Sequence, residues 1–126
     1  MNAAETAKLL AKCASYDRRK IGEADVIAWL EVLGDLRYAD CEQAVIGHYA
    51  QTADWIMPAH VRQRVLEIRH ERLRDTEIPA PPPELLDDPA AYGRAFQAAA
   101  IAIADGRDPH AAMAAVAAAR HRELEA

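Results

Sequence analysis

The amino-acid sequence predicts an all-α protein, and three observations support this fold class. Apolar residues recur at spacings of three and four, which is the periodicity of an amphipathic helix. Alternation of period two, the pattern of a half-buried strand, never persists. Residues that commonly begin or end helices stand at the ends of the periodic segments. The sequence therefore predicts a four-helix N-terminal domain at residues 2–76, a proline-rich linker at 77–88 and a helical tail at 89–124.

The first two predicted helices lie within residues 2–16 and 22–34. Asn2 and Glu5 have the spacing of a capping box, in which two side chains satisfy free N–H groups at a helix start. Gly34 stands where a helix commonly ends. The apolar residues predicted to face the core are Leu9, Leu10 and Cys13 in the first helix and Val26, Ile27, Trp29, Leu30 and Leu33 in the second.

The third and fourth predicted helices lie within residues 38–53 and 57–75. Gly47 weakens the third by about 1 kcal/mol relative to alanine. Pro58 suits the first turn of the fourth, where a missing N–H costs nothing. Trp55, between them, either packs beneath the fourth helix or is displayed to a partner. The predicted core-facing residues are Cys41, Ala44, Val45, His48 and Tyr49, then Val61, Val65 and Ile68, with Leu66 and Leu73 at the edge.

Composition changes at residues 77–88, where four prolines favour extended polyproline geometry. Beyond this linker, two Asp-Pro pairs, at 88–89 and 108–109, each place a capping aspartate before a proline at the first helical position. Gly106 is typical of a helix end. The tail is therefore predicted to contain two helices, at 89–105 and from 109 to about 123.

The tail is rich in alanine, which forms helices readily but buries little apolar area. We therefore expect it to dock on the first domain, on a second copy or on another protein. In its first helix an apolar stripe follows helical spacing, and the second helix adds two apolar side chains. The residues predicted to make this partner contact are Tyr92, Phe96, Ile103, Met113 and Val116.

The formal net charge of −5 argues against a protein that mainly coats phosphate backbones. Cys13 and Cys41 have no Cys-x-x-Cys pairing, and no signal peptide or long apolar run is present, so a reduced cytoplasmic protein that contacts no membrane is expected. The chain lacks a phosphate-binding glycine loop, a paired-acid motif and a nucleophile elbow. Cys13, Cys41 and His48 match no closed zinc site. We predict no enzyme activity, no cofactor and no metal.

Residues 9–68 resemble the phage loader-and-inhibitor family of replicative helicase loaders. The resemblance is carried by a leucine-rich first helix that leads into Tyr16, and by Trp29 and Leu33 in the second helix. It continues through the string DLRYAD at 35–40, His48 and, opening the last helix, Pro58. It covers about half the chain and implies a small helical protein that delivers a DnaB-type helicase to a phage origin. In that family a mobile C-terminal part makes most of the helicase contact, and here the linker and tail occupy its place.

The fourth helix suggests further contacts, because residues 57–75 hold five arginines against three acidic residues. The arginines scatter around the helix without interleaved aromatic residues, so a solvated face competes with contact to DNA or to an acidic protein such as an origin-binding protein. An alternative function is a DNA-binding regulator that uses this helix and dimerises through the tail. A structural or host-modulating phage protein is a third. The candidate contact residues are Arg62, Arg64, Arg69 and Arg72.

Overall fold

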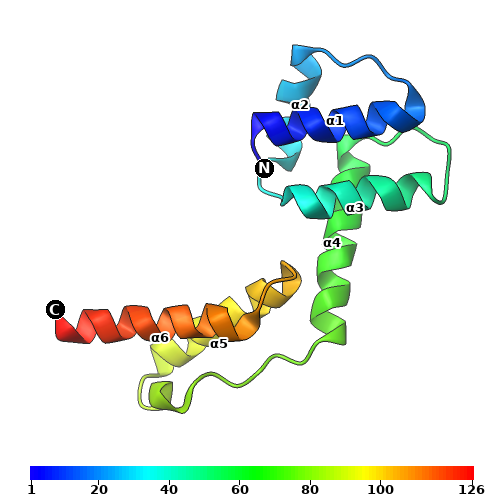
Figure 1. Ribbon diagram of the computed structural model, residues 1–126. Coiled ribbons are helices and arrows are strands. Elements are labelled where there is room, and N and C mark those ends of the chain that lie inside the picture. Colours follow the sequence, from blue (N-terminus) through cyan, green and yellow to red (C-terminus); the bar gives the residue numbers. More distant parts are fainter. The chain divides into compact units, whose positions relative to one another are not determined.

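The structure, a computed structural model, describes residues 1–126 and confirms the all-α fold, since its regular elements are helices and none is a strand (Figure 1). No helix combines the length and the apolar character needed to cross a membrane. The elements are α1 (Ala3–Asp17), α2 (Glu23–Leu33), α3 (Tyr38–Tyr49), α4 (Pro58–Asp75), the short 3-10 helix η1 (Pro83–Leu85), α5 (Pro89–Ala104) and α6 (Pro109–Glu125).

The chain divides into two units, here called unit 1 (residues 1–68) and unit 2 (residues 69–126). The division falls inside α4, whereas the sequence predicts that the first domain ends at residue 76. Each unit has its own cluster of buried apolar side chains.

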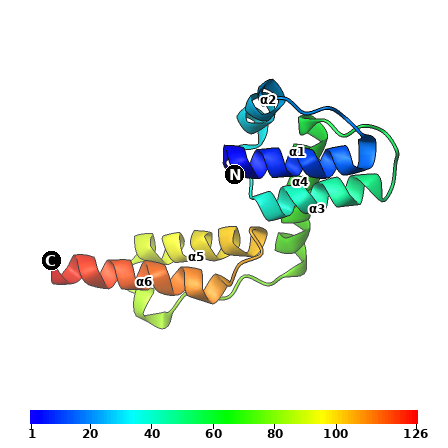
Figure 2. The ribbon, with the colours of Figure 1, turned by 45° about the horizontal axis from the view of Figure 1, so that its top comes forward.

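In unit 1, α1 packs against α2 and α3, and Figure 2 shows α1 and α3 side by side. The predicted capping box is present, because Asn2 accepts the Glu5 N–H at 2.9 Å and Glu5 accepts the Asn2 N–H at 3.0 Å. Most of the core comes from residues predicted to be buried. The buried apolar cluster contains Leu9, Leu10, Cys13, Trp29, Leu33, Leu36, Cys41, Ala44, Val45, Ile56, Val61 and Val65.

The buried side of α2 is narrower than the sequence predicts. Trp29 and Leu33 are buried with Val26 packed beside them, whereas Ile27 is exposed. Val26, Trp29 and Leu33 follow spacings of three and four, and Ile27 is turned about 100° from Val26 around the helix. The helix ends at Gly34, where a Cβ atom would lie 2.8 Å from the Leu30 carbonyl oxygen.

In unit 2, α5 and α6 lie side by side (Figures 1 and 2). Both predicted caps are present, since Asp88 accepts the Ala91 N–H at 3.2 Å and Asp108 accepts the His110 N–H at 2.9 Å. Gly106, with φ at 73°, supplies the left-handed residue between the helices. The core of unit 2 consists of Leu85, Ala91, Ala95, Ala99 and Met113, with Ile78, Tyr92, Val116 and Ala117 packed against it.

Part of the segment predicted as an extended linker is ordered in unit 2. Residues 83–85 form η1, and Leu85 is fully buried beside α5. Arg120 of α6 donates to the carboxylates of Asp87 and Asp88 at 3.2 and 3.1 Å. Helical spacing alone did not identify Leu85 as a core residue because it lies outside any periodic run.

Candidate interaction surfaces

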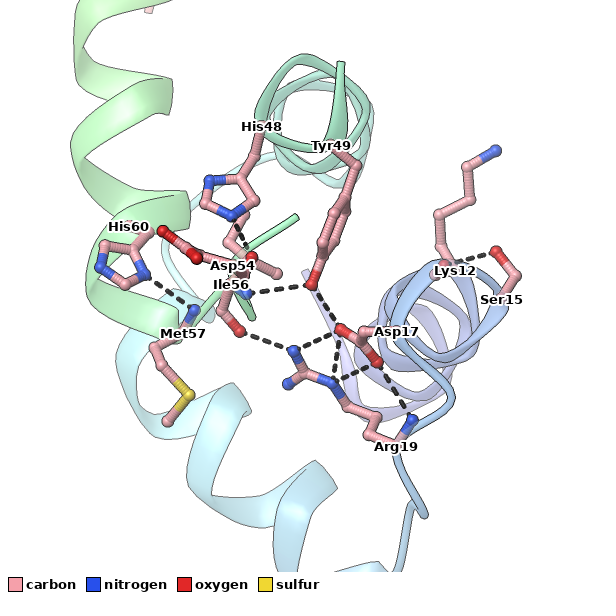
Figure 3. Close-up of polar contacts among 10 residues, drawn as sticks. All are labelled: Lys12, Ser15, Asp17, Arg19, His48, Tyr49, Asp54, Ile56, Met57 and His60. Carbon is pink, nitrogen blue, oxygen red and sulfur yellow. Dashed lines mark hydrogen bonds and ion pairs between the residues drawn. The ribbon is translucent and has the colours of Figure 1, made fainter. Parts of the chain in front are cut away.

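A polar network joins the end of α1 to α3 and to the segment before α4 (Figure 3). The Arg19 guanidinium pairs with the Asp17 carboxylate at 2.6 Å and donates to the Ile56 carbonyl at 2.8 Å. The Tyr49 hydroxyl donates to Asp17 and accepts the Ile56 N–H at 3.0 Å. The side chains of Arg19 and Asp17 are only 8% and 2% exposed, so this ion pair lies largely out of water.

The charges of this network follow from its geometry. Burial raises the pKa of Asp17, but hydrogen bonds from Arg19 and Tyr49 outweigh burial and hold that pKa below its ordinary value. Burial, together with the neighbouring Asp17 carboxylate, raises the pKa of Tyr49. At neutral pH the network therefore consists of one ion pair and one neutral phenol.

Two tryptophans flank the Arg19 guanidinium. Its central carbon lies 5.3 Å from the Trp29 ring centre and 4.9 Å from that of Trp55, within the range of cation–π attraction. Trp29 is buried, as predicted, while Trp55 remains 55% exposed. Trp55 thus combines both alternatives, since it contacts Arg19 and also presents surface to solvent. Tyr16, also exposed, lies on Tyr49 with ring centres 5.1 Å apart.

Sequence analysis missed the role of Arg19, which lies in the polar break between the first two helices. The available signal was local, because Asp17 precedes Arg19 by two residues and can accept both its backbone and its side-chain N–H groups. The contacts with Tyr49 and Ile56 span more than 30 residues, and no local pattern predicts them.

Most of the arginines of α4 have partners within the chain. Arg62 makes a two-pronged pair with Asp35 at 2.7 and 2.8 Å, and its hydrogen bond lowers the pKa of Asp35 to about 2. Arg74 lies 3.5 Å from the neighbouring carboxylate of Asp75. Arg64 has no carboxylate within ion-pair distance and lies beside Gly47 of α3.

Arg69 and Arg72 bind the C-terminal end of α5. Arg69 pairs with Asp105, and Arg72 donates to the Ala104 carbonyl at 2.9 Å. Carbonyl groups at a helix C-terminus carry partial negative charge, so two cations there are favourable. Burial raises the pKa of Asp105, but hydrogen bonds from Arg69 and Arg107 lower it below its ordinary value. Three of the four candidate contact arginines are thus engaged inside the molecule.

The predicted stripe of the tail does not form one exposed surface. Ile103 and Met113 are buried, and Tyr92 and Val116 are partly buried against the core of unit 2. Phe96 alone of the five predicted partner residues is exposed, at 44%. The reason is that α5 packs through its alanines, which buries Ile103 and leaves Phe96 exposed. Small side chains allow two helices to approach closely.

The outer side of α5 is apolar and nearly uncharged. Between residues 89 and 104 the only charged residue is Arg94. Ile101 is 54% exposed, and helical geometry places Gly93, Ala100 and the polar Gln97 between it and Phe96. No atom lies within 4 Å of the position that a Cβ of Gly93 would occupy. We call residues Gly93, Phe96, Ala100 and Ile101 the α5 face.

The side chains considered as zinc ligands, Cys13, Cys41 and His48, have other environments in the structure. Burial is the main cause that raises the pKa of Cys13 to about 11 and that of Cys41 to about 12, so both thiols are protonated at neutral pH. His48 donates to the Asp54 carbonyl at 2.7 Å. No group of three or more His, Cys, Asp and Glu side chains is placed to hold a metal ion.

Comparison of the chain with models of protein families, with curated proteins and with solved structures finds no match. The resemblance to helicase loaders therefore depends on the residues of the sequence that carry it. Among the exposed apolar side chains are those of the α5 face in unit 2 and the aromatic residues near Arg19 in unit 1.

Proposed function

We propose that the protein is a non-enzymatic adaptor that binds a DnaB-type replicative helicase and delivers or restrains it during phage DNA replication. In this proposal a four-helix domain at residues 2–76 is tethered through residues 77–88 to a helical tail at 89–124, in the cytoplasm of the bacterial host. Support comes from the resemblance of residues 9–68 to helicase loaders and from the α5 face.

The α5 face is the observation that carries the proposal. Contiguous exposed apolar patches on soluble proteins mark interaction sites more often than single exposed side chains do. Phe96 and Ile101 are both about half exposed, and the positions between them, Gly93, Gln97 and Ala100, carry no charge. This arrangement fits the apolar side of a partner helix, which could lie close to Gly93 with Phe96 and Ile101 on either side.

The adaptor acts through binding energy. A protein that binds one conformation of a helicase ring more tightly than another shifts the ring toward that conformation. A roughly 100-fold preference shifts the equilibrium by about 2.7 kcal/mol, which is enough to raise a state populated at about 10% to about 90% of the rings. The same bias can keep a ring inactive and ready for placement on DNA.

The test is comigration of the full chain with a DnaB-type hexamer in size-exclusion chromatography with light scattering. We expect the wild type to comigrate and Phe96→Asp and Ile101→Asp each to weaken binding about tenfold or more, because each places a charge in an apolar contact. Leu124→Asp is the matched control, since Leu124 is also exposed but lies in the last turn of α6.

Two results would contradict the proposal. The first is a wild-type chain that does not bind the hexamer. The second is unchanged binding by both α5 variants. A full chain that dimerises and shifts duplex DNA steeply at low salt would favour the alternative, a DNA-binding regulator. The pairing of Arg62, Arg69 and Arg72 inside the chain counts against that alternative.

A further inference from the structure

Arg64 differs from the other arginines of α4. The side chains of Arg62, Arg69 and Arg74 each pair with a carboxylate, and Arg72 donates to a helix-end carbonyl. Arg64 has neither kind of partner, although its side chain is half-buried. A half-buried guanidinium without a counter-ion has lost part of its hydration without gaining an ion pair.

Gly47 of α3 makes room for Arg64. A Cβ atom on Gly47 would lie 3.0 Å from the Arg64 Nε and 3.3 Å from its central guanidinium carbon. A side chain at position 47 would therefore force the Arg64 guanidinium to shift by a few tenths of an ångström or more. Glycine is the least favourable residue after proline inside a helix. The Arg64 guanidinium is thus held against α3 at Gly47 without an ion pair.

The surroundings of Arg64 add a second hydrogen-bond donor. His60 precedes it by one helical turn, and its Nδ1 accepts the Met57 N–H at 3.0 Å. The neutral ring therefore carries its proton on Nε2, which is free to donate. His60 stacks on His48, the residue after Gly47, with ring centres 5.9 Å apart. Glu67, three residues after Arg64 in α4, is the acidic residue nearest to it in the chain.

We propose that Arg64 is the residue through which unit 1 binds an Asp or Glu side chain of the helicase. This inference rests on the proposed function and adds a second, ionic contact to the apolar one on α5. A planar guanidinium binds a carboxylate through two parallel hydrogen bonds. A phosphate group offers similar chemistry. Nucleic acid, however, presents a row of phosphates, and the nearby arginines that could bind the other phosphates already have carboxylate partners.

The experiment measures the affinity of full-length variants for a DnaB-type hexamer by fluorescence anisotropy. We expect Arg64→Glu to weaken binding about 10- to 100-fold, as the loss of a charge-assisted contact does. Arg64→Lys keeps the charge but loses the planar fork, so an intermediate loss is expected. Arg62→Glu is the matched control, because it makes the same charge change two residues away on a side chain that already has a partner, and we expect less than about a threefold change.

Gly47→Ala separates a contact role from a structural one. Alanine favours the helix, so the thermal midpoint of the variant should stay equal or rise, while the displaced Arg64 should bind the helicase more weakly. If Arg64 served only the fold, Arg64→Glu would lower the thermal midpoint and leave the affinity of the folded protein unchanged, which overturns the inference.

The remaining outcomes are also decisive. If the wild type and Arg64→Glu bind the hexamer equally tightly, the proposed function stays intact and only this inference is overturned. A wild type that does not bind at all overturns both. Fluorescently labelled single- and double-stranded 20-mers serve as the nucleic-acid probe, and DNA binding that depends on Arg64 would show that the site takes phosphate.

Discussion

Units 1 and 2 are both helical, but they are held together differently. The core of unit 1 contains large side chains from all four of its helices, among them Leu10, Trp29, Val45 and Val65. The core of unit 2 consists mainly of alanines, with Leu85 and Met113 as its large members. Because the hydrophobic contribution scales with buried apolar area, each buried residue of unit 1 contributes more.

Unit 2 compensates with charged contacts at its ends. Arg120 connects α6 to the start of α5, while Arg69 and Arg72 bind the other end of α5. In unit 1 the comparable ion pair, Asp17 with Arg19, adds to an apolar core that is already extensive. Unit 1 should therefore respond most to the loss of apolar volume, and unit 2 to salt.

The largest effect is expected for Leu33→Ala in unit 1. Leu33 is fully buried in the core, so its truncation should lower the free energy of unfolding by about 2–5 kcal/mol. Both tryptophans lie in unit 1, so urea unfolding followed by tryptophan fluorescence measures this unit alone. A loss under 1 kcal/mol would contradict the picture of a tightly packed apolar core.

Asp17→Asn should be the next largest change, at about 3 kcal/mol, because it leaves the Arg19 charge without its partner. The pKa of Asp17 is lower in the folded protein than its ordinary value of 3.8. Its contribution is therefore complete above about pH 4 and is lost as pH falls further. The measurement is urea unfolding between pH 3 and 7, in which the wild type should lose this contribution at low pH and the variant should lack it throughout.

Arg120→Met should cost unit 2 about 1 kcal/mol, because it removes a partly exposed ion-pair cluster but keeps an apolar chain of similar length. Thermal unfolding monitored by far-ultraviolet circular dichroism reports both units. Subtracting the unit 1 transition, which tryptophan fluorescence detects, gives the transition of unit 2. Between 0.1 and 1 M NaCl the wild-type transition of unit 2 should move to lower temperature, and that of the variant should move less. An equal shift in both would argue against the charged contacts as the main support of unit 2.

Gly93→Ala should have the smallest effect, a gain of about 0.5–1 kcal/mol, since its Cβ would meet no atom and alanine favours helix. Gly34→Ala is the matched control in unit 1 and should destabilise, because its Cβ would lie 2.8 Å from a carbonyl oxygen. Thermal unfolding of both variants checks the pair. Destabilisation by Gly93→Ala would mean that the glycine serves the fold and not the α5 face.

Local patterns predicted the positions of the helices well. Asn2, Pro58 and the two Asp-Pro pairs act close to their own position in the chain, so their capping roles could be predicted from the sequence. Which side of a helix faces inward was harder to predict. In α2 neighbouring residues differ in burial, and Ile27, which was predicted to face the core, is exposed.

The interaction surfaces were the least predictable part. The stripe from Tyr92 to Ile103 is apolar and periodic, but so is the row of alanines beside it. Which of the two rows is buried depends on the packing of α6 against α5. The alanine row is buried, and Phe96 stays exposed. The partners of Arg62, Arg69 and Arg72 named above lie 27 to 36 residues away along the chain, beyond the reach of any helical spacing.

The labelling rate of the two buried thiols can measure how often unit 1 opens. Cys13 and Cys41 are fully buried in unit 1, and unit 2 contains no cysteine. An aromatic disulfide reagent reacts only with a thiolate that it can reach, so labelling has to wait until unit 1 opens and the thiol regains an ordinary acidity. Under conditions where reclosing outpaces reaction, the labelling rate gives the population of the open form. The unmodified chain can thus report how often unit 1 opens, in buffer or with a partner bound, without an introduced probe.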